Sequence, residues 1–168
     1  VLMAPGRRAN LEGLFADGAA PVLERGAIQA DRDGRTSIPG LYVIGDAKAG
    51  TIQLAHSASA QAANVVAVIA GKTPTVDVSL VPSCVYTAPE IASVGMTESE
   101  AKAAGRPVKT GKCLTGANGK CLIENAPSGY VKLVADGESG RLLGAQLVCP
   151  RATDLIGELA LAVQKGIT

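Results

Sequence analysis

The feature that most constrains the fold is a short apolar run with turn residues on both sides. The run, residues 41–44, follows Pro39-Gly40 and ends at Gly45-Asp46. Four apolar residues between such breakers are typical of a strand buried on both faces of a largely parallel sheet. The next stretch, 53–70, is rich in alanine, its larger apolar residues recur near the helical period, and Gly71 ends it. The first half is therefore predicted to contain a strand, a glycine-containing loop and a long helix.

Composition excludes several classes of function. The 168 residues include 16 Lys+Arg and 15 Asp+Glu, so the chain has no basic field for nucleic acid. Three tyrosines and one phenylalanine cannot form the stacking surfaces of an RNA-binding sheet. Apolar runs are too short for a membrane span. The four cysteines contain no C-x-x-C pair, and one histidine cannot complete a metal set, so we expect no metal site and reduced thiols in a cytoplasmic protein.

Both ends of the sequence indicate a segment of a longer chain. The first residue is Val rather than Met, and the opening run 1–4 is predicted to be a buried strand. The last residues, 164–168, follow directly on a helical pattern. A mature protein with trimmed ends is the alternative.

The second half is predicted to be an α+β domain, an antiparallel sheet covered by helices. Thr97 and Glu100 have the spacing of a capping box, which predicts a short helix that stops at Gly105. Thr153 is the predicted cap of a second helix, through Lys165. Strands are expected at 82–87, 91–94, 107–114, 120–123, 130–135 and 141–149. On this basis Cys113 and Cys121 would lie on neighbouring strands.

Asp46 is the strongest candidate for chemistry. An acidic residue just after a parallel strand lies where open α/β sheets bind ligands. Its carboxylate can accept hydrogen bonds from ribose or ribityl hydroxyls, and the start of the following helix offers unpaired N–H groups to anionic oxygen. The alternative is a simple strand-to-helix turn in which Asp46 is a solvated or capping carboxylate.

Three segments together resemble a known family. Residues 38–46 with 53–58 are similar to the second flavin-binding segment of the pyridine nucleotide-disulfide oxidoreductases. Residues 85–97 resemble the opening of that family's C-terminal dimerisation domain, and 1–10 resemble the strand and turn that close its NAD-binding domain. The resemblance is colinear over essentially the whole chain.

The resemblance implies a domain organisation. Residues 1–10 would end the NAD-binding domain, 11–71 would form the C-terminal α/β part of the FAD-binding domain, 72–80 a linker, and 81–168 an incomplete α+β dimerisation domain. The expected fold class is therefore an α/β portion of an FAD-binding domain followed by an α+β dimerisation domain.

The resemblance also implies site residues. Asp46 would bind the ribityl chain of FAD, and Gly6 would contact NAD. The residues expected beside the isoalloxazine, through backbone contacts, are Gln53, Leu54, Ala55 and His56. The loop 49–52 looks one residue longer than in many relatives, which leaves the register of the resemblance at Gln53 undefined. For His56 the alternative is a first-turn histidine bonded to backbone.

The implied activity belongs to the branch of the family that oxidises dihydrolipoamide, because Leu54-Ala55-His56 follows the Gly-Asp loop. FAD and NAD are the implied cofactors. A homodimer through 81–168 and a lipoyl-carrying protein of a 2-oxoacid dehydrogenase or glycine cleavage complex are the implied partners. The family's redox cysteine pair, glycine-rich phosphate loops and His/Glu base are not in this sequence, so we expect no catalytic residue here. The alternatives are a mercuric, coenzyme A-disulfide or glutathione reductase, or a non-catalytic dimerisation remnant.

Overall fold

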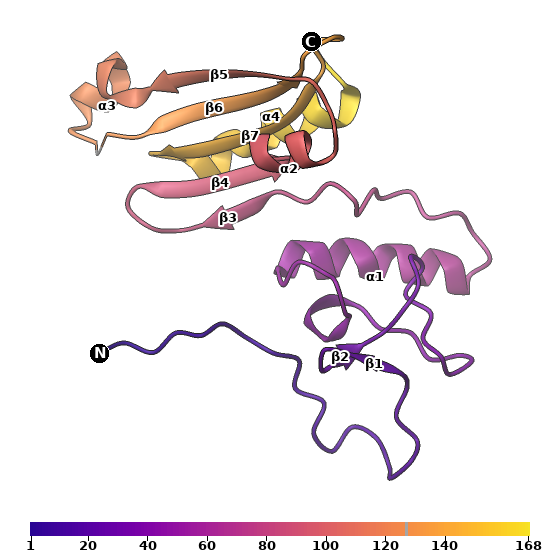
Figure 1. Ribbon diagram of the computed structural model, residues 1–168. Coiled ribbons are helices and arrows are strands. Elements are labelled where there is room, and N and C mark those ends of the chain that lie inside the picture. The colour runs from indigo at the N-terminus through magenta and orange to yellow at the C-terminus, as the bar shows by residue number, and fades with distance from the viewer. Residues whose placement is uncertain (127) are drawn as a thin grey trace. The chain divides into compact units, whose positions relative to one another are not determined.

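The computed structural model describes residues 1–126 and 128–168 and divides the chain into two units, 1–79 and 80–168. The first unit contains a two-stranded antiparallel ribbon, in which β1 (Leu23–Glu24) pairs with β2 (Ala27–Ile28). A short 3-10 helix, η1 (Gly45–Ala47), and a long helix, α1 (Ala55–Ile69), follow (Figure 1).

Helix α1 confirms the helix predicted at 53–70. Its buried face includes Ser57 and Gln61, and the remaining positions are mostly alanine and valine. The chain leaves the helix through Gly71, whose φ of +68° lies in the left-handed region that favours glycine. The glycine stop was therefore predicted correctly.

The strand predicted at 41–44 is not a regular strand. The segment is extended, but its pairing is limited to an antiparallel bridge between Tyr42 and Arg35, and the Val43 N–H donates to the Gly34 carbonyl at 2.9 Å. Val43 is buried, whereas Ile44 is 37% exposed. An interior strand of a parallel sheet is hydrogen-bonded to a neighbouring strand along each edge. The described part of this unit contains no parallel strand beside 41–44.

The strand predicted at 1–4 is absent for the same reason. The structure describes residues 1–10 without regular secondary structure, and Val1, Leu2 and Met3 are exposed. A run of apolar residues becomes a strand only when another strand accepts and donates its backbone hydrogen bonds.

The second unit is built on one five-stranded antiparallel sheet. Its strands are ordered β3-β4-β7-β6-β5 (Figure 1). Their bounds are Ser83–Val85 for β3, Glu90–Gly95 for β4, Val108–Leu114 for β5, Tyr130–Asp136 for β6 and Leu142–Cys149 for β7.

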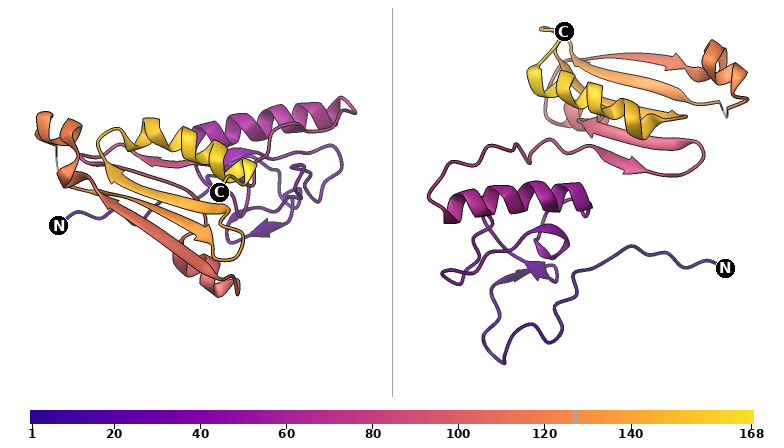
Figure 2. Two further views of the ribbon diagram at one scale, coloured as in Figure 1. Left: turned by 90° about the horizontal axis from the view of Figure 1, so that it is seen from above. Right: turned by 180° about the vertical axis from the view of Figure 1, so that it is seen from behind.

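The core of this unit lies between the sheet and the last helix, α4 (Ala152–Lys165). Figure 2 shows α4 along one face of the sheet, against the central strands β4 and β7. Leu147 is the largest fully buried side chain. In the sheet it lies opposite Ala92 of β4 on one side and Val131 of β6 on the other. The buried cluster consists of Ala92, Val94, Ala145, Leu147, Cys149, Ala152 and Ile156. The predicted antiparallel sheet with helical cover is confirmed.

The capping box is also confirmed. Helix α2 (Glu98–Ala103) begins after Thr97, whose hydroxyl oxygen accepts from the Glu100 N–H at 3.2 Å. In return the Thr97 N–H donates to the Glu100 carboxylate at 2.8 Å. Two backbone donors at the helix start are therefore satisfied by local side chains.

Two predictions in this unit are wrong. Residues 120–123 form a helix, α3 (Gly119–Ile123), because the Asn118 side chain accepts from the Lys120 and Cys121 N–H groups at 3.1 and 3.2 Å. Cys121 is thus not on a strand beside Cys113. A 3-10 helix, η2 (Thr115–Ala117), precedes α3.

Thr153 does not cap α4 either. The helix begins two residues earlier than predicted, after Arg151, which has a φ of +58° and no side-chain cap. Thr153 instead donates twice to the Glu90 carboxylate, from its N–H at 2.9 Å and its hydroxyl at 2.7 Å. These bonds tie the first turn of α4 to the start of β4.

Candidate functional site

The candidate site is the turn at Gly45 and Asp46 that leads toward helix α1. Gly45 is buried with a φ of +64°, and a Cβ atom on it would lie 3.0 Å from Ala58 Cβ. Both the backbone conformation and the tight approach to α1 favour glycine. The turn therefore lies directly against the helix, and Asp46 follows at its outer side.

Gln61 anchors this turn. Its Oε1 accepts from the Gly45 N–H at 2.8 Å, and its Nε2 donates to the hydroxyls of Thr51 at 2.6 Å and Ser57 at 3.2 Å. The Gln61 side chain, Gly45 and Ser57 are all buried, so removal of the amide would leave the Gly45 N–H and the Ser57 hydroxyl without water to replace it. One residue thus joins η1, the loop before α1 and α1 itself.

The sequence alone assigned no role to Gln61. The signal that could have revealed this role is the spacing of Ser57 and Gln61. They are polar residues four positions apart, so they lie on the same face of a helix that is otherwise mostly alanine and valine. Polar side chains on a buried helix face are normally committed to hydrogen bonds.

The Asp46 carboxylate is half-exposed and forms an ion pair with Arg7, at 3.6 Å between Nη1 and Oδ2. The same guanidinium donates from Nη2 to the Gln53 carbonyl at 2.6 Å. Arg7 therefore brings together the predicted residues Asp46 and Gln53. An ion pair this exposed contributes little free energy, so the carboxylate stays accessible to a hydroxyl ligand. Sequence reasoning assigned Arg7 no role.

The start of α1 supplies donors beside this carboxylate. Leu54 is the N-cap, and no side chain caps the helix there. Ala55 and His56 are exposed, whereas Leu54 and Gln53 are half-buried. A helix start without a side-chain cap presents N–H groups and the positive end of the helix dipole.

Gly6 is the predicted residue least constrained by the structure. It is exposed, its φ is +97°, and a Cβ atom there would meet nothing within 4 Å. Its connection to the site is through the chain, because Arg7 follows it. The proposed contact with NAD stays a prediction.

These groups fit the ribityl and ring region of a flavin in chemical type. A carboxylate accepts from sugar-like hydroxyls, and helix-start N–H groups donate to ring oxygen and nitrogen. Asp46 would hold the ribityl chain, and the backbone at 53–56 would lie beside the ring. The assignment of each contact stays a prediction.

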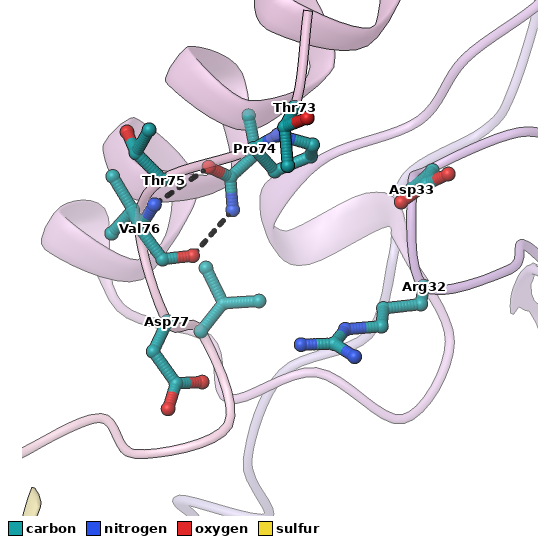
Figure 3. A pocket seen from close by; sticks show the side chains of 9 residues that line it. Arg32, Asp33, Thr73, Pro74, Thr75, Val76 and Asp77 are labelled. Carbon is teal, nitrogen blue, oxygen red and sulfur yellow. Dashed lines mark hydrogen bonds between the residues drawn. The ribbon is translucent and has the colours of Figure 1, made fainter.

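The first unit also contains a cavity of about 420 Å³ that does not include the predicted site (Figure 3). Arg32 and Asp33 line one part of it and the segment 73–78 another. Asn64 holds this segment, donating to the Val76 carbonyl at 2.7 Å and accepting from the Val76 N–H at 3.1 Å. The pKa of Asp77 is lowered by hydrogen bonds from Ser79 and by Arg32.

The described residues contain neither a cluster of metal ligands nor a membrane-spanning helix. Across 1–126 and 128–168, no three His, Cys, Asp or Glu side chains gather as they would around a metal ion. In the same residues, no helix combines the length and the apolarity needed to cross a bilayer.

Comparison with known families identifies the chain. Residues 81–168 match the dimerisation domain of the pyridine nucleotide-disulphide oxidoreductases, and residues 1–62 match the pyridine nucleotide-disulphide oxidoreductase domain. The chain belongs to the pyridine nucleotide-disulphide oxidoreductase family. The resemblance and the fold class predicted from the sequence are thereby confirmed.

Within the family, similar proteins share one name. The chain is 44% identical to a dihydrolipoyl dehydrogenase of Chlorobaculum tepidum, over its whole length but 36% of that relative. It is 42% identical to a dihydrolipoyl dehydrogenase of Bacillus subtilis, over 96% of this chain and 34% of the relative. The chain therefore spans about a third of the length of these relatives.

Solved structures give the same fold. The structure of LpdA from Mycobacterium tuberculosis matches with a TM-score of 0.86 and 31% identity, covering 99% of this chain and 37% of that one. The flavoprotein disulfide reductase RclA from Escherichia coli matches with a TM-score of 0.85 over 97% of this chain and 38% of that one. At 23% identity, RclA supports the fold alone.

Proposed function

We propose that this chain supplies the later part of the FAD-binding domain and the dimerisation domain of a dihydrolipoyl dehydrogenase. The proposed boundaries are 1–10 for the end of the NAD-binding domain, 11–71 for the FAD-binding part, 72–80 for a linker and 81–168 for the dimerisation domain. The observation that carries the proposal is the turn at Gly45-Asp46, fixed to α1 by Gln61 beside a helix start without a side-chain cap.

The whole protein would oxidise dihydrolipoamide with NAD through FAD and a redox disulfide. The chemistry that FAD would supply when bound is two-electron transfer between the dithiol and NAD. Asp46 would orient the cofactor through its ribityl hydroxyls. The N–H groups at the start of α1 would stabilise negative charge on the flavin ring. Gln61 positions both by holding the turn against the helix.

The remaining proposals concern assembly and location. The unit that contains the sheet would form a homodimer through residues within 81–168. The oxidised partner would be a lipoyl-carrying protein of a 2-oxoacid dehydrogenase or glycine cleavage complex, and the protein would work in the cytoplasm. The sequence itself lacks a cysteine pair four residues apart and has one histidine, His56. We therefore expect the 168-residue chain alone to be inactive.

The test uses the full-length protein that carries this chain. We expect NAD reduction with dihydrolipoamide, and Asp46→Ala should weaken FAD binding about tenfold or more, because a hydrogen bond to a charged acceptor is worth about 1.5–3 kcal/mol. Asp154→Ala is the matched control, since Asp154 is an exposed carboxylate paired with an arginine, as Asp46 is. It should leave FAD affinity unchanged.

Two outcomes would contradict the proposal. The first is activity with glutathione disulfide, coenzyme A disulfide or mercuric ion and none with dihydrolipoamide, which would place the protein in another branch. The second is equal loss of FAD in Asp46→Ala and Asp154→Ala, which would remove the ribityl role. A lipoamide-reduction assay on the 168-residue chain checks the separate expectation of inactivity, and turnover above background would disprove it.

A further inference from the structure

Two thiols on different elements line one cavity of the second unit. The cavity has a volume of about 430 Å³, within the range of small-molecule sites. Cys121 reaches it from α3, and Cys149 reaches it from the end of β7. Both are free thiols in this structure.

The two thiols differ in their surroundings. Cys149 is 3% exposed and belongs to the buried core beside α4. Burial raises the pKa of Cys149, and the nearby Cys121 and Glu90 raise it further. Cys121 is less buried, which makes it the more accessible attacking group.

The rest of the cavity suits a small disulfide. Val131, Pro150 and Leu155 supply apolar surface for methylene groups. Lys120 and Arg151 also line the cavity, and each has an acidic neighbour there, Glu124 at 2.7 Å and Asp154 at 3.1 Å. Thr115 and Asn118 add uncharged polar groups, and a lining of this mixed character favours a small organic molecule with polar ends.

We propose that Cys121 and Cys149 form a thiol–disulfide exchange site that reduces a low-molecular-weight disulfide and becomes a disulfide itself. The Cys121 thiolate attacks one sulfur of the disulfide RSSR, which forms a mixed disulfide and releases one RS⁻ that takes up a proton. Cys149, after losing its proton, attacks the Cys121 sulfur and releases the second RS⁻. Two protein thiols are oxidised by two electrons, and RSSR is reduced to two RSH.

Formation of the bond would close the cavity. A disulfide holds its sulfurs about 2 Å apart, so the bond would draw α3 and the end of β7 together. Helix α3 is suited to this movement, because it has five residues, several of them exposed, and is capped by the single side chain of Asn118. The exchange itself requires no flavin.

The sequence makes the product easy to map. Trypsin cleaves after Lys72, Lys102, Lys112, Lys120, Lys132, Arg141 and Arg151, which places each of the four cysteines on its own peptide. The 168-residue chain carrying Cys113→Ser is the working protein, since Cys113 is exposed and would compete for the oxidant. It is treated with oxidised glutathione or with neutral 2-hydroxyethyl disulfide, alkylated and digested.

We expect the titratable thiols to fall from three to one, with peptides 121–132 and 142–151 linked. Dithiothreitol should restore both thiols. A faster reaction with oxidised glutathione would indicate that Lys120 and Arg151 favour anionic disulfides. Equal rates with the two disulfides would indicate that the apolar part of the lining determines which disulfide binds. Cys121→Ser in the same background should abolish the link, while far-UV circular dichroism stays unchanged. The proposal is overturned if glutathione stays on Cys121 without loss of the Cys149 thiol, or if the link joins Cys84.

Discussion

Replacing Gln61 with leucine is the sharpest test of how the candidate site is held together. Leucine has a similar size and the same helical preference but cannot accept the Gly45 N–H or donate to the Thr51 and Ser57 hydroxyls. The Gly45 N–H is fixed by the backbone in a buried turn, so it loses its acceptor.

The magnitude follows from these contacts. A buried donor without a partner costs about 1–3 kcal/mol, and the two amide-to-hydroxyl bonds add about 1 kcal/mol each when no substitute is found. Burial of the leucine side chain offsets about 1.5–2 kcal/mol of this loss. The free energy needed to open the turn should therefore fall by about 2 kcal/mol, which raises the equilibrium constant for opening about thirtyfold.

Hydrogen exchange followed by mass spectrometry measures this opening directly. The amide of Gly45 should exchange about thirtyfold faster in Gln61→Leu, because exchange requires the turn to open. Ser59→Ala is the control on the same helix, since Ser59 is exposed and its hydroxyl only donates to the Ala55 carbonyl. It should change exchange by less than about twofold. Unchanged Gly45 exchange in Gln61→Leu, with α1 intact, would refute the anchoring role.

Two further predictions concern the second unit. Leu147→Ala should lower the free energy of unfolding by about 2–5 kcal/mol in urea denaturation, because it leaves a cavity between the sheet and α4, while exposed Leu114→Ala should cost less than about 0.5 kcal/mol. Equal costs would show that the core is misplaced. Hydrogen bonds from Lys102 and Lys132 lower the pKa of Glu98 to about 2 from its ordinary 4.5. Its stabilising contribution is thus present above pH 4.5 and lost as the pH falls toward 2, so Glu98→Gln should flatten the acid side of a stability profile. An unchanged profile would contradict the ion pairs.

Local chemistry made part of the fold predictable. The capping box at Thr97 and the stop at Gly71 depend on a few adjacent residues, and both were predicted correctly. The antiparallel sheet was predictable because its runs of apolar residues are separated by clear turn residues. The prediction of a strand at 120–123 was wrong because two local preferences conflict there. Leucine and isoleucine favour a strand, whereas Asn118 caps a helix.

Contacts between distant residues were not predictable in this way. The segment 41–44 is apolar enough for a strand, but strand formation depends on neighbours that the segment itself does not encode. The position of Asp46 as a candidate followed from its place in the chain. Its link through Arg7 to Gln53, and the support from Gln61, are contacts over 16 to 46 residues that one sequence does not reveal.

The order of the sheet has a consequence for aggregation. The two outer strands are β3, which has three residues and follows Pro82, and β5, which follows Pro107 and carries Lys109 and Lys112. Short edges, proline and lysine all oppose the docking of a foreign strand. Strands β4, β7 and β6 lie between these two edges. Even at high concentration, this sheet is a poor template for fibre growth.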